Sequence, residues 1–167
     1  MSYLTQKTIK NNVSFSGIAL HSGLSVNVCI KPAEPNFGIV FKRVDLKENN
    51  IVYPNFMNVS NTSLNTTVEN EFGVKVSTIE HLMGALFGLG IDNALVEIDN
   101  EEVPIMDGSS KDFFQIFESI DKVDQSKKRK YLKILNKVEL IDGKRKISIE
   151  PNNQNSLEVD FQLQYKN

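Results

Sequence analysis

Residues 77–98, STIEHLMGALFGLGIDNALVEI, decide the fold class, because a helix pattern is followed at once by a strand pattern. Apolar residues recur at the spacing of one helix face, at Ile79, Leu82, Met83 and Leu86. Ser77 and Glu80 fit a capping box at the helix start, and Gly90 predicts a stop just beyond its end. Residues 94–98 then predict a short strand.

The chain on both sides of this stretch combines further strands with a second helix. Upstream, alternating apolar residues predict strands over 25–31 and 39–44. Downstream, Asp107-Gly108-Ser109 predicts a turn that leads into a helix, with Asp107 as the simplest cap. The apolar stripe of this second helix consists of Phe113, Ile116, Phe117 and Ile120. Strands mixed with two helices predict an α+β fold.

The C-terminal part has a different pattern. Residues 121–129 are polar and predict a linker. Three strands are expected after it, at 131–140, 146–150 and 157–165. A strand meander without a helix leaves one sheet face uncovered, so it is expected to be only part of a domain. The pattern therefore indicates one domain followed by part of another.

Composition excludes several classes of protein. The chain has 167 residues, of which 40% are hydrophobic and 24% charged, enough for a folded core. A net charge of -2 gives no sign of a nucleic-acid partner. The single cysteine, Cys29, excludes a disulfide framework and a cysteine-based zinc knuckle. There is no signal peptide or apolar run of membrane-spanning length, so we expect a soluble, cytoplasmic protein without an integral membrane segment.

One basic cluster stands out between Lys122 and Lys146. The simpler interpretation is a solvated segment between domains. The alternative is a contact with an anion or an anionic lipid.

Two histidines, His21 and His81, are the candidates for metal chemistry. His81 follows Glu80 in the first turn of the predicted helix, and a histidine ligand beside a carboxylate base suits a hydrolase that activates metal-bound water. A zinc hydrolase needs three protein ligands, however, so the pair alone is a weak signal. The alternative is that Glu80 caps the helix and His81 faces solvent or a neighbour. His21 lies in a glycine-flanked turn, where histidines are usually structural.

Four segments occur in a distinctive order along the chain. They are Gly17-Ile18-Ala19-Leu20-His21-Ser22-Gly23, Asn61-Thr62-Ser63-Leu64-Asn65-Thr66-Thr67, Ser77-Thr78-Ile79-Glu80-His81-Leu82 and Pro104-Ile105-Met106-Asp107-Gly108-Ser109. Between the last two lies Gly88-Leu89-Gly90-Ile91-Asp92-Asn93. The series resembles the N-terminal half of the UDP-3-O-acyl-N-acetylglucosamine deacetylase (LpxC) family, the zinc enzymes of lipid A biosynthesis. Its asparagine- and lysine-rich character is similar to the Bacteroidetes-type members.

The resemblance implies an architecture and a chemistry. The family fold has two similar domains, each a two-layer arrangement of a sheet covered by two helices. The resemblance therefore implies a first domain over 1–125 and the truncated start of a second over 126–167. The family's zinc ligand matches His81, and its general base, which activates the water that attacks the acetamide of the UDP-sugar, matches Glu80. Residues Thr62, Ser63, Leu64 and Asn65 match a segment that lines the substrate site. His21 and Asp107 match motif positions and are candidates for site support without an assigned step.

The resemblance also defines what this sequence lacks. In the family, the remaining zinc ligands come from a His-x-x-x-Asp helix in the second domain, and no such motif occurs here. We therefore expect an N-terminal fragment, inactive alone, whose missing C-terminal domain is in some family members followed by a fused hydroxyacyl-carrier-protein dehydratase. The alternative is a non-catalytic truncated copy that binds a sugar nucleotide or a protein partner.

Overall fold

The computed structural model describes residues 4–154 and 156–164, and the chain divides into two units, Met1–Arg129 and Lys130–Asn167. The elements of unit 1 follow in the order β1 (Thr5–Ile9), β2 (Val13–Ile18), β3 (Ser25–Pro32), β4 (Ile39–Arg43), β5 (Ile51–Val52), η1 (Phe56–Asn58), β6 (Val59–Asn61), β7 (Thr67–Glu69), β8 (Lys75–Val76), α1 (Glu80–Gly88), β9 (Ala94–Ile98), α2 (Lys111–Glu118) and β10 (Lys122–Lys128). The elements of unit 2 are β11 (Val138–Asp142) and β12 (Arg145–Ile149).

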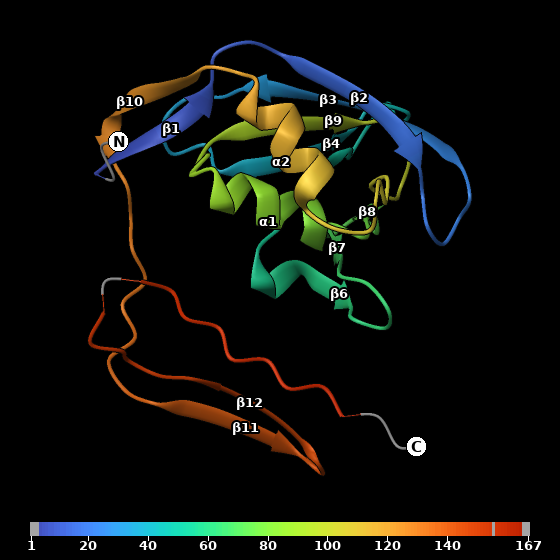
Figure 1. The fold of residues 1–167 in the computed structure, drawn as a ribbon. Coiled ribbons are helices and arrows are strands. Elements are labelled where there is room, and N and C mark those ends of the chain that lie inside the picture. The colour runs from blue at the N-terminus through green and yellow to red at the C-terminus, as the bar shows by residue number, and fades with distance from the viewer. Residues whose placement is uncertain (1–3, 155, 165–167) are drawn as a thin grey trace. The chain divides into compact units, whose positions relative to one another are not determined.

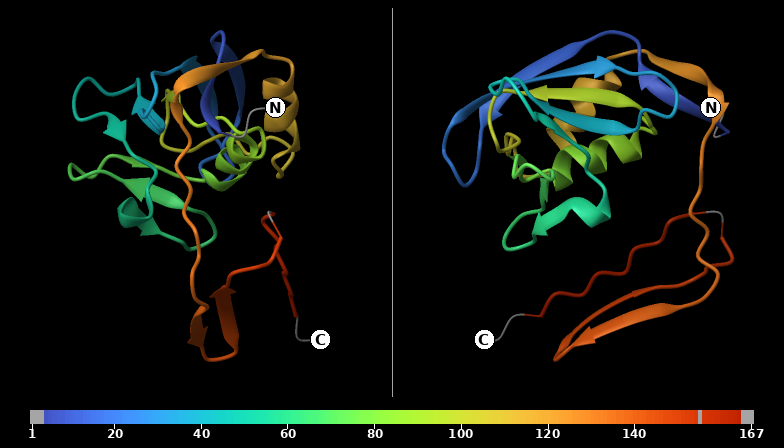
Figure 2. Two further views of the ribbon diagram at one scale, coloured as in Figure 1. Left: turned by 90° about the vertical axis from the view of Figure 1, so that its left-hand side faces the viewer. Right: turned by 180° about the vertical axis from the view of Figure 1, so that it is seen from behind.

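A five-stranded sheet in the order β2-β3-β9-β4-β5 forms one layer of unit 1. Its pairs are antiparallel except β4 and β9, which run parallel. The predicted alternation of β3 is confirmed, since Val26, Val28 and Ile30 are buried. Both helices lie on one face of this sheet (Figures 1 and 2).

The two helices bury apolar stripes against the sheet, as predicted. In α1, Leu82, Ala85 and Leu86 are buried, and in α2 Phe113 and Phe117 are buried. The ring of Phe113 also meets the ring of Phe15 from β2, edge to face at 5.6 Å between centroids. Aromatic pairs favour this arrangement. The predicted α+β fold, with a sheet covered by two helices, is therefore confirmed.

The structure contradicts the predicted linker at the end of unit 1. Residues 121–129, expected to be a linker, contain strand β10, which pairs antiparallel with β1. The boundary between the units falls after Arg129, a few residues later than the predicted end at residue 125. The sequence of β10 is polar because the strand lies in a two-stranded ribbon and most of its side chains are exposed.

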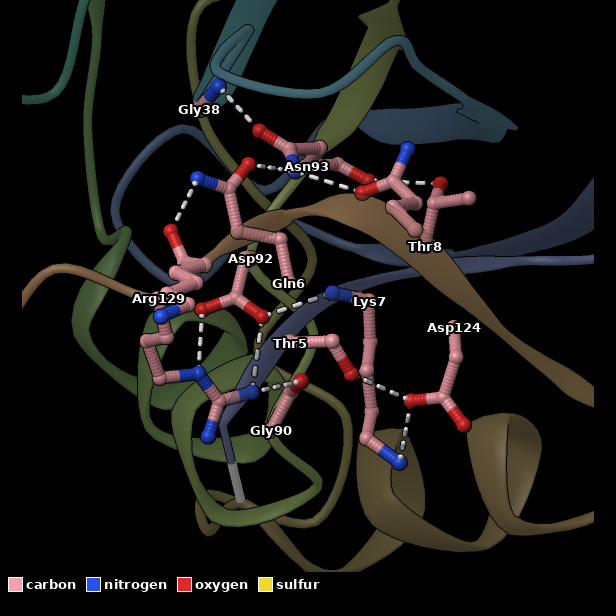
Figure 3. A network of polar contacts seen from close by, with 12 residues as sticks. Thr5, Gln6, Lys7, Thr8, Gly38, Gly90, Asp92, Asn93, Asp124 and Arg129 are labelled. Carbon is pink, nitrogen blue, oxygen red and sulfur yellow. Dashed lines mark hydrogen bonds and ion pairs between the residues drawn. The ribbon is translucent and has the colours of Figure 1, made fainter. Parts of the chain in front are cut away.

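A polar network joins this ribbon to the turn that follows α1 (Figure 3). Asp92 accepts hydrogen bonds from the backbone N–H of Lys7 at 2.8 Å and from Nε and Nη2 of Arg129, each at 2.7 Å. Arg129 also donates to the carbonyl of Gly90 at 2.7 Å. Beside it, the amide of Asn93 donates to Gln6 on β1 at 3.0 Å. The segment 88–93 thus holds both strands of the ribbon.

Unit 2 consists of a hairpin, β11 paired with β12, whose turn contains Gly143 at φ 59°. The turn was predicted. Of the three expected strands, two are present, and β11 begins only at Val138. Residues 157–164 are not in a strand, and position 165 of that predicted strand lies outside the described residues. Among the described residues of unit 2, none is buried. That this unit begins a second domain similar to the first stays a prediction.

Candidate active site

The pair Glu80-His81 opens α1. Glu80 is exposed, and its Oε2 accepts a hydrogen bond from the backbone N–H of Thr66 at 3.1 Å. The predicted capping box is wrong. The N-cap is Ile79, without a side-chain cap bond, and Ser77 instead pairs with Glu102 in an isolated β-bridge. Capping therefore does not compete for the Glu80 carboxylate, which lies where a helix N-terminus stabilises negative charge.

His81 is half-buried, and α2 holds its backbone. Ser110 Oγ donates to the carbonyl of His81 at 2.8 Å. This contact needs the small residue at Gly84, because a Cβ there would lie 3.0 Å from Ser110 Oγ. Gly84 thus lets the start of α2 approach the backbone of His81, the candidate metal ligand.

Asp107 lies in the turn before α2. Its carboxylate accepts from the side chain and the backbone of Ser109, each at 2.9 Å. These bonds lower the pKa of the exposed Asp107, and the bond from the Ser109 side chain has the larger effect. The N-cap of α2 is Ser110, so the interpretation of Asp107 as the cap is wrong. Asp107 organises the turn that carries Ser110 to His81.

The polar run after β6 lies at the entrance to α1. Thr62, Ser63 and Leu64 are exposed and Asn65 is half-buried. Asn65 Nδ2 donates to Thr78 Oγ1 at 3.3 Å, and its Oδ1 accepts from Thr67 Oγ1 at 3.1 Å. Together with the Thr66 bond to Glu80, these contacts bring the second motif of the series beside the third.

His21 lies in the turn between β2 and β3 with an exposed side chain. Its backbone N–H donates to Glu102 at 3.0 Å, and that of Ser22 donates to the same carboxylate at 3.0 Å. Glu102 also accepts from Thr78 Oγ1 at 3.0 Å. One carboxylate therefore joins the histidine turn to the residues that precede α1.

Sequence reasoning did not identify Glu102. It belongs to an acidic pair, Glu101-Glu102, which resembles an ordinary surface turn, and the only signal was its place just before the Pro104 motif. Its side chain is buried, which opposes ionisation. The hydrogen bonds from His21, Ser22 and Thr78 outweigh that cost and hold the pKa of Glu102 below its usual value.

The first and fourth motifs meet directly. The backbone N–H of Ile105 donates to the carbonyl of Ile18 at 3.0 Å. Gly17 permits this approach, because a Cβ there would lie 2.9 Å from Pro104 Cβ and 3.1 Å from Met106 Sδ. All four motifs of the series are thus connected within unit 1.

The described residues do not fit a complete zinc site. In residues 4–154 and 156–164, no group of three or more His, Cys, Asp or Glu side chains is placed to hold a metal ion. His81 can provide one nitrogen ligand, fewer than the three that a zinc hydrolase uses. Within the same residues, no helix is long and apolar enough to cross a bilayer.

Comparison with known proteins matches the chain almost from end to end. Residues 6–167 match the profile of a family described as UDP-3-O-acyl N-acetylglycosamine deacetylase, LpxC. A relative from Shewanella woodyi named UDP-3-O-acyl-N-acetylglucosamine deacetylase is 41% identical over 160 residues, which cover 96% of this chain and 52% of the relative. A relative of the same name from Geobacter sp. strain M21 is 44% identical over 158 residues, 95% of this chain and 52% of the relative. The chain spans about half the length of these curated relatives.

Proposed function

The chain belongs to the UDP-3-O-acyl-N-acetylglucosamine deacetylase family, and on that basis we propose that residues 1–167 supply one side of the active site of such a deacetylase. Its reaction would remove acetate from UDP-3-O-acyl-N-acetylglucosamine in lipid A biosynthesis. The observation that carries the proposal is the Glu80 carboxylate, exposed in the first turn of α1, next to His81 and joined through Thr66 to the polar run.

Glu80 takes the part of the general base in this proposal. It accepts a proton from the water whose oxygen bonds to the carbon of the acetamide carbonyl. That proton passes to the nitrogen as the C–N bond breaks, which releases acetate and the free amine and leaves the carboxylate ionised again. Glu80 lies in the first turn of α1, the end of a helix at which acidic side chains are favourable. Thr66 orients the carboxylate, and residues 62–65 lie beside it as the substrate-lining segment.

Zinc is the cofactor that the family implies, and His81 is the ligand that this chain would contribute. When bound, zinc would supply Lewis-acid polarisation of water and carbonyl. The described residues hold this single candidate ligand, so the other ligands of a zinc site would have to come from outside them. For the same reason we propose that residues 1–167 do not turn over substrate by themselves.

Replacement of the base tests the proposal in the full-length protein. Glu80→Gln keeps an oxygen that can accept from Thr66, so the fold should persist while proton transfer is lost. Acetate release from the UDP-sugar should fall about 10²- to 10⁴-fold. Glu118→Gln, at the exposed end of α2, is the matched control and should keep full activity.

Two results would count against the proposal. Full activity in Glu80→Gln would remove Glu80 from its role as base. A full-length protein that binds the UDP-sugar but releases no acetate would instead support the non-catalytic binding module.

A further inference from the structure

We propose that Glu102 is a positioning residue for the Glu80-His81 pair, an inference that rests on the proposed function. The structure connects Glu102 to that pair through Thr78, which lies two residues before Glu80. It connects the same carboxylate to the turn that carries His21. Loss of Glu102 should therefore weaken the chemical step without removal of any group that touches substrate.

The surroundings of Glu102 are those of an anchor. The residue is 3% exposed. Its carboxylate accepts hydrogen bonds from His21 N–H, Ser22 N–H and Thr78 Oγ1, each with a donor–acceptor distance of 3.0 Å. Its partners lie 24, 80 and 81 positions away in the sequence. A buried charge with this number of donors is well satisfied, and its removal would leave those donors unpaired.

Thr78 is the partner that connects this anchor to the catalytic pair. It is 2% exposed and has φ 55°, a left-handed conformation that is a genuine outlier for a β-branched residue. The surrounding structure must stabilise such a conformation for it to persist. The hydroxyl of Thr78 donates to Glu102 and accepts from Asn65, so its orientation is determined from both sides.

The backbone around Glu102 is attached to the same segment. Ser77 N–H donates to the carbonyl of Glu101 at 2.8 Å, and Val103 N–H donates to the carbonyl of Ser77 at 3.0 Å. Glu102 is therefore held on each side against the residue that precedes Thr78. A change in the side chain of Glu102 should therefore displace Thr78 and the His21 turn. Displacement of Thr78 would in turn change the direction in which α1 begins.

The carboxylate group itself is required. A carboxylate presents two acceptor oxygens, whereas a glutamine presents one and turns an NH₂ group toward the other donors. Glu102→Gln therefore keeps the size of the side chain but loses part of the anchor. Thr78→Val removes the bond from Thr78 to Glu102 and the bond from Asn65 to Thr78, and it leaves those from His21 and Ser22 to Glu102 in place.

The test compares variants of the full-length protein. In Glu102→Gln we expect kcat for acetate release to fall about 10- to 100-fold while KM stays within about twofold, because small displacements of catalytic groups reduce rate steeply. Thr78→Val should show a smaller fall of the same kind. Glu97→Gln is the matched control, because this half-buried carboxylate on β9 pairs with Lys31 and Lys42 instead, and it should keep kcat.

Backbone NMR of the 167-residue chain provides a readout independent of activity. Glu102→Gln should shift the amide signals of Thr78, Glu80 and His81, change the φ-dependent coupling of Thr78 and speed amide exchange at His21 and Ser22. Unchanged signals at Thr78 to His81 would overturn the inference whatever the activity. If Glu102→Gln fails to fold, Thr78→Val is read by the same two measurements.

The kinetic outcomes separate this inference from the proposed function. In one outcome, the unaltered full-length protein is active, Glu80→Gln is inactive, and neither Glu102→Gln nor Thr78→Val lowers kcat. The role of Glu102 is then wrong, whereas the proposed function stands. If the unaltered protein is inactive, or Glu80→Gln is fully active, the proposed function fails and with it the role of Glu102 in that reaction.

Discussion

At the scale of single residues, Glu80 and Glu102 show how position suits one side-chain type to two different proposed roles. Glu80 is exposed at the start of a helix, as the proposed role of general base requires. Glu102 is buried and satisfied by three donors, so it is suited to hold other groups in place. The two glutamates differ in burial and in hydrogen-bond partners. Neither property can be inferred from the adjacent residues in Glu80-His81 or Glu101-Glu102.

The lowered pKa of Glu102 predicts a contribution to acid sensitivity. Its usual value is 4.5, and a carboxylate whose pKa is lower in the folded state stabilises the fold above that value and loses the contribution as pH falls through the folded value. The free energy of unfolding should therefore fall below about pH 4.5 in the unaltered chain. Glu102→Gln should lower stability at pH 7 and should show less of this acid loss.

Urea unfolding at pH 7 and at several values below 4.5 measures this difference. The other carboxylates are common to both chains, so the comparison isolates Glu102. Glu118→Gln, at the exposed end of α2, serves as the mutational control. Parallel pH profiles for Glu102→Gln and the unaltered chain would contradict the prediction.

Residue-scale prediction from sequence succeeded for local patterns and failed for distant partners. Glu80 and His81 stand out because they are adjacent on a periodic helix, and the structure places them in its first turn. Their roles remain predictions. The capping box was wrong because Ser77 forms a bridge with Glu102, 25 residues later, and that tertiary pairing outweighs a local cap. No local pattern reveals such a competitor.

At the scale of elements, close contacts between motifs depend on small residues. Gly17→Ala should destabilise unit 1 by about 1–3 kcal/mol, because the added methyl would overlap Pro104 and force β2 away from the 104–109 turn. Gly88→Ala is the matched control, since nothing lies within 4 Å of a Cβ there, and it should cause no loss. Thermal unfolding of both variants is the measurement, and equal melting temperatures would contradict the prediction.

The pairing of β10 with β1 gives a second prediction at this scale. Arg129→Ala removes three hydrogen bonds that connect the end of the ribbon to Gly90 and Asp92 (Figure 3), at a cost of about 1–3 kcal/mol. Amide exchange should speed up along β10 and leave β9 largely unchanged. Lys127→Ala, exposed in the same strand, is the control. Equal exchange rates in the two variants would argue against an anchoring role for Arg129.

Element prediction was best where burial was strong and poorest where it was weak. Strand β3 and both helices follow from apolar periodicity, because each buries one face in the core. Strand β10 was predicted as a linker because the exposed ribbon needs no apolar stripe. Its stability comes from the backbone ladder with β1 and from Arg129, both long-range features.

At the scale of the whole molecule, the chain spans about half the length of its curated relatives, and its described residues hold one candidate zinc ligand. Structural zinc sites bind the metal with a free energy of roughly 10 kcal/mol at the weak end of their range. We expect the 167-residue chain to bind zinc more weakly than this. Competition with a chromophoric chelator at pH 7 measures the affinity. His81→Ala should reduce the residual binding, and tight binding of one zinc per chain would contradict the prediction.

The α+β class, the two amphipathic helices and the family all follow from the order of the amino acids, because periodic apolar positions and short motifs are local properties of the chain. Only the tertiary structure decided that β10 belongs to unit 1, that Ser77 pairs with Glu102 instead of capping α1, and that a buried carboxylate connects the histidine turn to Thr78. These features depend on residues that meet across 24 or more positions of sequence. Hydrogen-bond geometry between such distant donors and acceptors exists only once the core has brought them together.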